Sequence, residues 1–77
     1  MVSDERVVRA AGEAAESVVF SRCSRSDVDD LDITVSFENG VLDVDVYLNA
    51  PGVEGVEAVA DDAALAAREA VDDLLVD

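Results

Sequence analysis

The chain has no Lys, no His and no Trp, and it has a single Cys and a single Pro. Without His, and with Cys23 alone, the usual ligand sets for zinc and the usual imidazole and thiol catalysts are missing. The five cations are all Arg and face 19 Asp and Glu, which gives a net charge of −14. Because nucleic acids and anionic membranes are bound through Lys and Arg, we expect neither as a partner. We also expect no metal and no cofactor.

The chain is rich in small apolar residues. Of its 77 residues, 51% are hydrophobic, and most of these are Val and Ala. This length allows one small domain, residues 1–77. Small side chains each bury little area, so the core is lean. Since one Cys excludes an internal disulfide, we expect oligomerisation to supply the missing stability.

The acid excess is typical of a halophilic protein. At multimolar ionic strength the Debye length falls to about 3 Å or less, so that repulsion between carboxylates no longer opposes folding. The alternative is an acidic interaction surface in an ordinary cell. No segment resembles a signal peptide or a membrane span, and a lone Cys fits a reducing interior. We therefore expect a cytoplasmic protein.

Residues 3 to about 21 have a helical pattern. Ser3 is placed to cap the N-terminus, and Asp4 and Glu5 lie in the first turn, where the helix dipole favours anions. Gly12 weakens this helix by about 1 kcal/mol relative to Ala and is typical of a close backbone approach. One apolar stripe follows the helical period: Val7, Ala11, Ala14, Ala15 and Val18. Residues 21–30 are typical of a loop, with a helical turn expected near residues 26–30.

Asn39-Gly40 predicts a β-hairpin, because a two-residue type I′ turn needs positive φ at both central positions. Counting outward from this dipeptide pairs Glu38 with Val41 and ends with Leu31 opposite Leu48. Turn chemistry and alternation are independent signals, and they agree on this register. One face of the ribbon is then entirely apolar: Leu31, Ile33, Val35, Phe37, Leu42, Val44, Val46 and Leu48.

A second helix is predicted from about Glu54 to Leu75. Its start is open to two interpretations, because Gly55 is a poor helix former and Asp61 offers an alternative N-cap. The broad apolar arc indicates contact with both the sheet and the other helix. It consists of one stripe, Val56, Val59, Ala63, Ala66, Ala70 and Leu74, and a neighbouring one, Ala60, Ala64, Ala67, Val71 and Leu75.

These elements predict an α+β fold of α-β-β-α order, with both helices packed on the apolar face of the hairpin. A two-stranded ribbon is marginal by itself and leaves two open edges. Two hairpins joined edge to edge across a two-fold axis would form a four-stranded antiparallel sheet. We therefore expect a homodimer, in which the helices bury four residues of the sheet: Leu31, Ile33, Val44 and Val46.

Three segments resemble a known family. They are Phe20-Ser21-Arg22 at the end of the first helix, Leu31-Asp32-Ile33-Thr34-Val35 and Leu42-Asp43-Val44-Asp45-Val46. In these segments the chain is similar to a small archaeal family, domain of unknown function 3194, and the resemblance extends over nearly the whole chain. It implies the same α-β-β-α order and a haloarchaeal member. It implies no activity, cofactor or catalytic residue, because none is established for the family.

The polar outer face of the hairpin is the candidate partner-binding surface. Asp32 and Thr34 lie on its first strand, and Asp43, Asp45 and Tyr47 lie on its second. Tyr47 is the expected anchor, and plain solvation of the sheet is the alternative. Paired carboxylates act as acid and base only where burial separates their pKa values, and an open face provides no burial. We therefore expect no catalytic residue.

Two further clusters fail as sites. The acid run at residues 27–32 invites comparison with a calcium loop, but Leu31 and Asp32 occupy positions where that loop needs an oxygen ligand and a Gly. Four Arg in the N-terminal third do not share one helix face, which argues against a nucleic-acid patch: Arg6, Arg9, Arg22 and Arg25. We expect them to pair with the acidic strands of this chain or of a second copy.

Together these observations predict a non-enzymatic protein-interaction module that binds another protein or a second copy of itself. The alternative is a small-ligand-binding or regulatory domain with a pocket between the helices and the sheet. An enzyme is disfavoured, because the chain has no His or Lys and Cys23 has neither residue to activate it.

Overall fold

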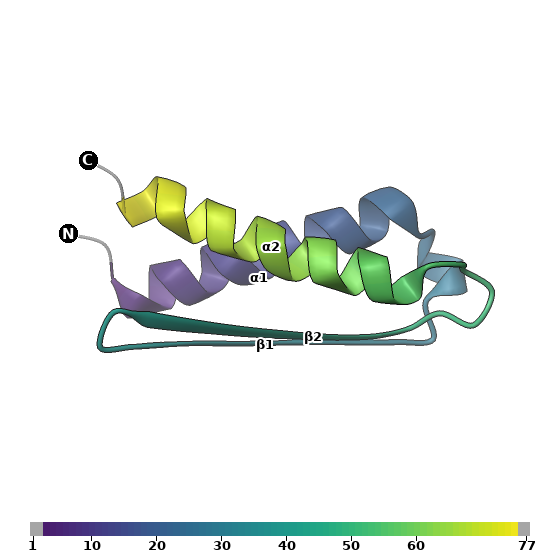
Figure 1. Ribbon diagram of the computed structural model, residues 1–77, viewed down its shortest axis with the longest axis horizontal. Helices are drawn as coiled ribbons and strands as arrows, with labels where there is room; N and C mark the ends of the chain where they lie inside the picture. Colours follow the sequence, from purple (N-terminus) through teal and green to yellow (C-terminus); the bar gives the residue numbers. More distant parts are fainter. Residues whose placement is uncertain (1–2, 76–77) are drawn as a thin grey trace.

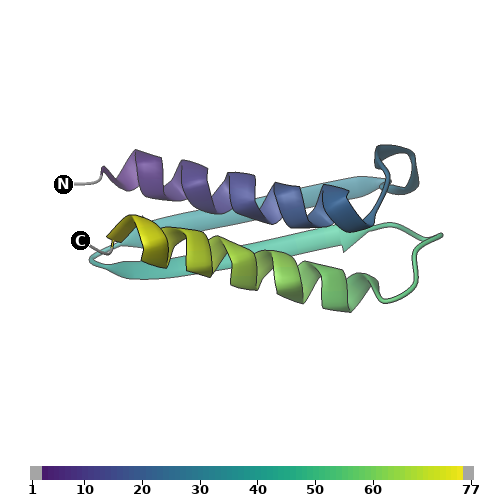
Figure 2. The same cartoon turned by 90° about the horizontal axis from the view of Figure 1, so that it is seen from above.

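The structure is a computed structural model and describes residues 3–75. Two helices lie side by side on one face of a β-hairpin, and the other face of the hairpin is uncovered by these residues (Figures 1 and 2). The order α-β-β-α confirms the predicted α+β fold. The elements are α1 (Asp4–Arg22), a 3₁₀ turn η1 (Arg25–Asp27), β1 (Asp30–Glu38), β2 (Val41–Asn49) and α2 (Val56–Leu75).

Helix α1 begins where its sequence signals place it. Ser3 Oγ accepts a hydrogen bond from the Arg6 N–H at 3.2 Å, which satisfies one of the free donors of the first turn. At the other end, the Cys23 N–H donates to the Val19 carbonyl at 2.8 Å. The loop that follows contains η1 at Arg25–Asp27, slightly earlier than the helical turn expected near residues 26–30.

The hairpin has the predicted register along its whole length. Asn39 and Gly40 both have positive φ, 52° and 78°, as a type I′ turn requires. From this turn, nine residues of β1 pair with nine of β2, from Glu38 opposite Val41 to Asp30 opposite Asn49. The turn and the alternation therefore determine the register of this segment.

Helix α2 begins at Val56 rather than at Glu54, and Asp61 lies inside it instead of capping it. The chain leaves β2 through a turn in which the Val53 N–H donates to the Ala50 carbonyl at 3.0 Å. Gly55 then adopts a φ of 72°, in the left-handed region that favours glycine, and its carbonyl accepts the Val59 N–H at 3.1 Å. This left-handed residue excludes Glu54 from the helix.

The core is centred on the contact between the two helices. Every buried residue of this seam is Val or Ala, and small side chains at four-residue spacing let the helices approach closely. No side chain that is polar or charged is buried among residues 3–75. The seam residues are Val7, Ala11, Ala15 and Val19 on α1 and Val59, Ala63, Ala67 and Val71 on α2. Val19 is buried, although the predicted stripe of α1 did not include it. On α2, the buried residues come from both predicted stripes, two from each.

The apolar face of the hairpin is covered less completely than the seam. Leu48 is the one residue of its eight that is buried, and the other seven are partly buried against the same core. Leu31, Ile33, Val44 and Val46, which we expected to be buried under the helices of a homodimer, are among these seven. A single chain therefore leaves part of its apolar sheet surface accessible.

Candidate partner-binding surface

The five predicted surface residues lie together on the outer face of the hairpin. The register places Asp32 opposite Tyr47 and Thr34 opposite Asp45, with Asp43 one pair further along. All five are exposed, and Tyr47 retains 57% of its surface. Within residues 3–75, none of their side chains makes a hydrogen bond or an ion pair. The face is therefore an acidic surface with one aromatic side chain available for contact.

Both long edges of the hairpin present free peptide groups. In a two-residue hairpin the pair next to the turn exchanges both hydrogen bonds, and bonded and non-bonded pairs then alternate. Residues of the non-bonded pairs point their N–H and C=O groups away from the partner strand, and no other element of residues 3–75 takes up these groups. On β1 they belong to Leu31, Ile33, Val35 and Phe37, and on β2 to Leu42, Val44, Val46 and Leu48.

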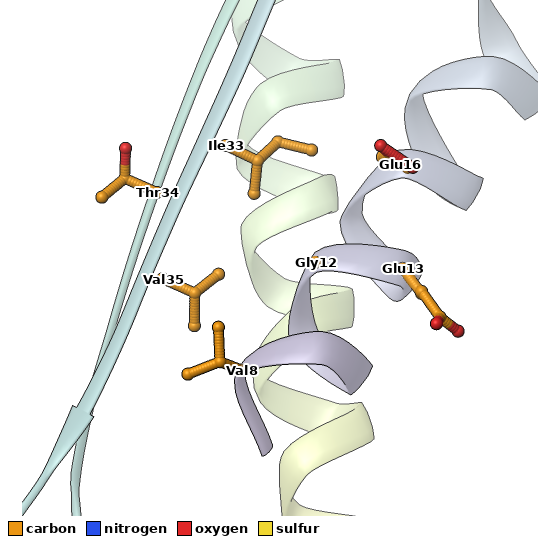
Figure 3. A pocket seen from close by; sticks show the side chains of 7 residues that line it. All are labelled: Val8, Gly12, Glu13, Glu16, Ile33, Thr34 and Val35. Carbon is orange, nitrogen blue, oxygen red and sulfur yellow. The ribbon is translucent and has the colours of Figure 1, made fainter. Parts of the chain in front are cut away.

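A groove of about 460 Å³ lies between α1 and β1, beside the free edge of β1. Val8, Ile33 and Val35 point into it, whereas Thr34 points to the opposite side of the strand (Figure 3). Gly12 lies on its helix side, and a Cβ at this position would have no atom within 4 Å. The sequence interpretation of Gly12 as a point of close backbone approach is therefore wrong, because this glycine widens an opening.

The groove has an acidic rim that continues along α1. Glu13 and Glu16 line the groove and also line a neighbouring hollow of about 250 Å³. Phe20 and Arg25 lie in this second hollow, with the Arg25 guanidinium 4.4 Å from the centre of the Phe20 ring. A cation over an aromatic ring contributes about 0.5–1 kcal/mol at an exposed site. The sequence suggested a pocket between the helices and the sheet only as an alternative, and it identified none of these lining residues as a site.

Two Arg side chains, Arg9 and Arg22, form ion pairs with acids on helices and not with the acidic strands. Arg22, at the end of α1, forms an ion pair with Asp62 of α2 and so links the two helices. Arg9 pairs with Glu5, one turn earlier in α1, at 3.2 Å. The expectation that they pair with the strands of the same chain is wrong for these two residues, because the outer face of the hairpin is turned away from the layer that contains them (Figure 1). Pairing with the strands of a second copy stays a prediction.

The remaining polar features show no assembled site. Asp27 accepts a hydrogen bond from Ser24 Oγ at 2.9 Å, within the loop before β1. Cys23 is a buried thiol beside the end of α1. Residues 3–75 hold no cluster of three or more His, Cys, Asp or Glu side chains placed to bind a metal. None of the helices in this range is long and apolar enough to cross a membrane.

Comparisons with known sequences agree with this architecture. The family described as "Protein of unknown function (DUF3194)" matches residues 4–74, which include both helices and the hairpin. An uncharacterised protein of Natronomonas pharaonis is 50% identical over 70 residues, which cover 91% of this chain and 84% of that protein.

Two solved structures have the same fold. The solution structure of the hypothetical protein mth677 from Methanothermobacter thermautotrophicus superposes with a TM-score of 0.81 at 18% identity, over 97% of this chain and 90% of that one. A crystal structure from Thermococcus onnurineus NA1 gives a TM-score of 0.75 at 28% identity, over 97% and 81% of the two chains. The first of these likenesses, at this low identity, concerns the fold alone.

Proposed function

Given that this chain belongs to the DUF3194 family, whose function is unknown, we propose that it is a non-enzymatic protein-interaction module. Its partner is another protein or a second copy of itself, and it works in a salt-rich cytoplasm. The observation that carries the proposal is the hairpin, which combines two edges of free peptide groups with a partly buried apolar face. Such an edge is a template for pairing with another chain.

The polar surface supports a role in binding rather than in catalysis. Catalytic acids and bases need environments that separate their pKa values, and these environments require burial or close charged neighbours. Asp32, Asp43 and Asp45 are exposed on an open sheet face. Tyr47 beside them offers the kind of aromatic side chain that anchors protein interfaces.

The acid excess supports function at high salt. The net charge of −14 on 77 residues is accompanied by a 50% identical relative in Natronomonas pharaonis, a haloarchaeon. At molar salt the charges are screened within a few Å, so an acidic surface binds through apolar contacts and hydrogen bonds more than through long-range attraction.

Small-ligand binding is a second candidate, and the groove between α1 and β1 favours it. About 460 Å³ lies within the range of small-molecule sites, and Val8, Ile33 and Val35 form an apolar lining. The side-chain polar groups at the groove are the carboxylates of Glu13 and Glu16, because the Thr34 side chain points to the opposite side of the strand (Figure 3). A ligand of this groove would therefore be apolar with a cationic group.

Affinity capture from a haloarchaeal lysate in 3 M KCl tests the proposal. Tyr47→Ala and Val41→Ala remove side chains of similar exposure, 57% and 63%, from the same strand. We expect one stoichiometric protein to be retained by the unmodified chain and by the Val41→Ala control, and retention to fall at least tenfold for Tyr47→Ala. A small molecule released on denaturation, with no retained protein, would favour the ligand-binding candidate instead.

Self-association needs a separate measurement. Sedimentation equilibrium in several molar KCl, over a wide range of protein concentration, reports the mass of the assembly. A mass that rises to two chains supports the homodimer, and a mass of one chain at every concentration contradicts it.

A further inference from the structure

We propose that the groove between α1 and β1 binds an extended protein segment of alternating apolar and basic residues, which adds a third strand to the sheet at the free edge of β1. This inference rests on the proposed function and defines the chemistry of the partner. Val8, Gly12, Glu13 and Glu16 of α1 and residues 33–35 of β1 line the groove.

The edge of β1 provides the hydrogen bonds for such a strand. Four residues of β1 direct their peptide groups outward at every second position, which is the spacing that an added strand requires. The strand is nine residues long and contains no Pro or Lys, two residues that commonly block an edge. The four edge residues are Leu31, Ile33, Val35 and Phe37.

Apolar side chains fit the helix side of the added strand. An added strand continues the alternation of the sheet, so every second side chain lies beside Ile33 and Val35, beneath α1. Ile33, Val35 and Val8 form an apolar surface around this position (Figure 3). Because Gly12 has no side chain and a Cβ there would meet nothing within 4 Å, the space above this surface is open.

Basic side chains fit the remaining positions. The alternate residues of the added strand lie beside the outer face of β1, where Asp30, Asp32 and Glu38 are exposed. None of these three acids forms an ion pair within residues 3–75, so the outer side of the edge is complementary to Arg or Lys.

An extended segment fits this edge better than a second copy of the whole chain. Packed helices need about 8–10 Å between their axes, whereas neighbouring strands are about 4.8 Å apart. Two helices over two strands therefore occupy the full width of the sheet, with α1 above β1 (Figure 2). A second copy at the β1 edge would bring its own α1 into this space, together with a second Glu13 and Glu16. A bare segment brings neither a helix nor further acids.

Calorimetric titration of the full chain in 2 M KCl tests the inference, with an eight-residue peptide of alternating Val and Arg as the probe. Gly12→Leu places a side chain in the groove and removes a helix-weakening glycine, so the variant should remain folded. Ala58→Leu adds the same side chain at an exposed position of α2 and is the matched control. We expect affinity to fall at least tenfold for Gly12→Leu and to be unchanged for Ala58→Leu.

A second probe tests the pairing with the protein unchanged. The same peptide, N-methylated at the alternate residues whose N–H groups would face β1, keeps its side chains and charge but cannot donate to the strand. We expect its affinity to fall at least tenfold. Equal affinity for the two peptides, or for the Gly12→Leu variant and the unmodified chain, would overturn the inference.

The remaining outcomes separate this inference from the proposed function. A concentration-dependent dimer that Gly12→Leu abolishes would assign the groove to a second copy and overturn the extended segment as its occupant. Absence of peptide binding together with Tyr47-dependent capture of a protein would overturn the inference and leave the proposed function standing. Absence of peptide binding, of capture and of self-association would contradict both.

Discussion

Two neighbouring stripes of α1, one residue apart in the sequence, differ in how completely they are covered. Val7, Ala11, Ala15 and Val19 are 0% exposed and are sealed against α2. The adjacent stripe of Val8, Gly12 and Glu16 lines the groove beside β1. The residues of both stripes are spaced by four positions, so the spacing alone does not distinguish the two stripes. The difference shows that one chain completes the contact between its helices but leaves the contact between helix and sheet edge open.

The chemistry of the two stripes follows this difference. At the sealed stripe, Ala and Val are fully buried in the contact with α2, and a polar group there would lose its water without gaining a partner. At the open stripe, Glu16 remains hydrated and Gly12 makes room. The seam therefore serves stability, and the groove is available for binding.

Salt should have the largest effect, because the seam is uncharged while the surfaces around it hold the net charge of −14. At 0.01 M salt the Debye length is about 30 Å, so every carboxylate repels the others and opposes the compact state. We predict that helical circular dichroism collapses on dialysis to millimolar salt and returns with KCl. A melting temperature that is unchanged between about 0.05 M and 3 M KCl would show that the seam alone stabilises the fold against repulsion between the carboxylates.

Adding one carboxylate to each stripe is the sharpest comparison between them. Ala11→Asp buries a charge without a partner in the seam and should cost about 3–5 kcal/mol of unfolding free energy, enough to unfold this small chain. Gly12→Asp places the same charge at the open groove and should change stability by less than about 1 kcal/mol. Urea denaturation in 3 M KCl measures both. Equal destabilisation would mean that the groove is closed in solution.

Truncating one Val in the seam and one in the sheet extends the comparison. Val71→Ala removes two buried carbon atoms and leaves a cavity, which should cost about 2 kcal/mol. Val46 lies on the partly buried face of the hairpin, so Val46→Ala should lower the unfolding free energy by about half as much. Chemical denaturation of the two variants provides the difference. A larger loss of unfolding free energy at Val46 would show that the sheet face contributes more to stability than the seam does.

The ion pairs should have the smallest effect. Arg22→Ala removes a link between the helices whose two side chains remain about half exposed, and exposed pairs contribute up to about 1 kcal/mol. Arg9→Ala removes a pair within one turn of α1, which contributes about 0.3–0.5 kcal/mol. Thermal melts at 0.5 M and 3 M KCl should show the Arg22 effect shrinking with salt. An Arg22 effect of several kcal/mol would mean that charge, and not the seam, holds the helices together.

The sequence predicted the hairpin more fully than any other part of the chain. Asn39-Gly40 fixed the turn, and strict alternation fixed which face is apolar, so each pair from Glu38–Val41 to Leu31–Leu48 is confirmed. The start of α2 was wrong by two residues, because the positive φ of Gly55 depends on the turn that precedes it. The outer face of the hairpin was placed correctly, but whether it binds a partner stays a prediction.

The sequence offered a pocket between the helices and the sheet as an alternative, but the position and the lining of the groove could not be predicted from it. Its existence depends on how α1 lies relative to β1, and no local signal encodes that arrangement. Gly12 is compatible with both a close approach and an opening, and only the neighbouring atoms distinguish the two. The partners of Arg9 and Arg22 were also missed, because the acids of the strands lie on the face turned away from the helices, and both partners are on helices.

Residue-resolved amide hydrogen exchange in 3 M KCl tests the central claim most directly. In the free chain, the amides of the α1–α2 seam should exchange slowly, while those of Leu31, Ile33, Val35 and Phe37 exchange fast. Addition of the peptide of alternating Val and Arg should slow these four β1 amides at least tenfold and leave the outward amides of β2, such as Val44, unchanged. Fast exchange at all four β1 amides with the peptide bound, or slow exchange there in a free monomer, would contradict the account.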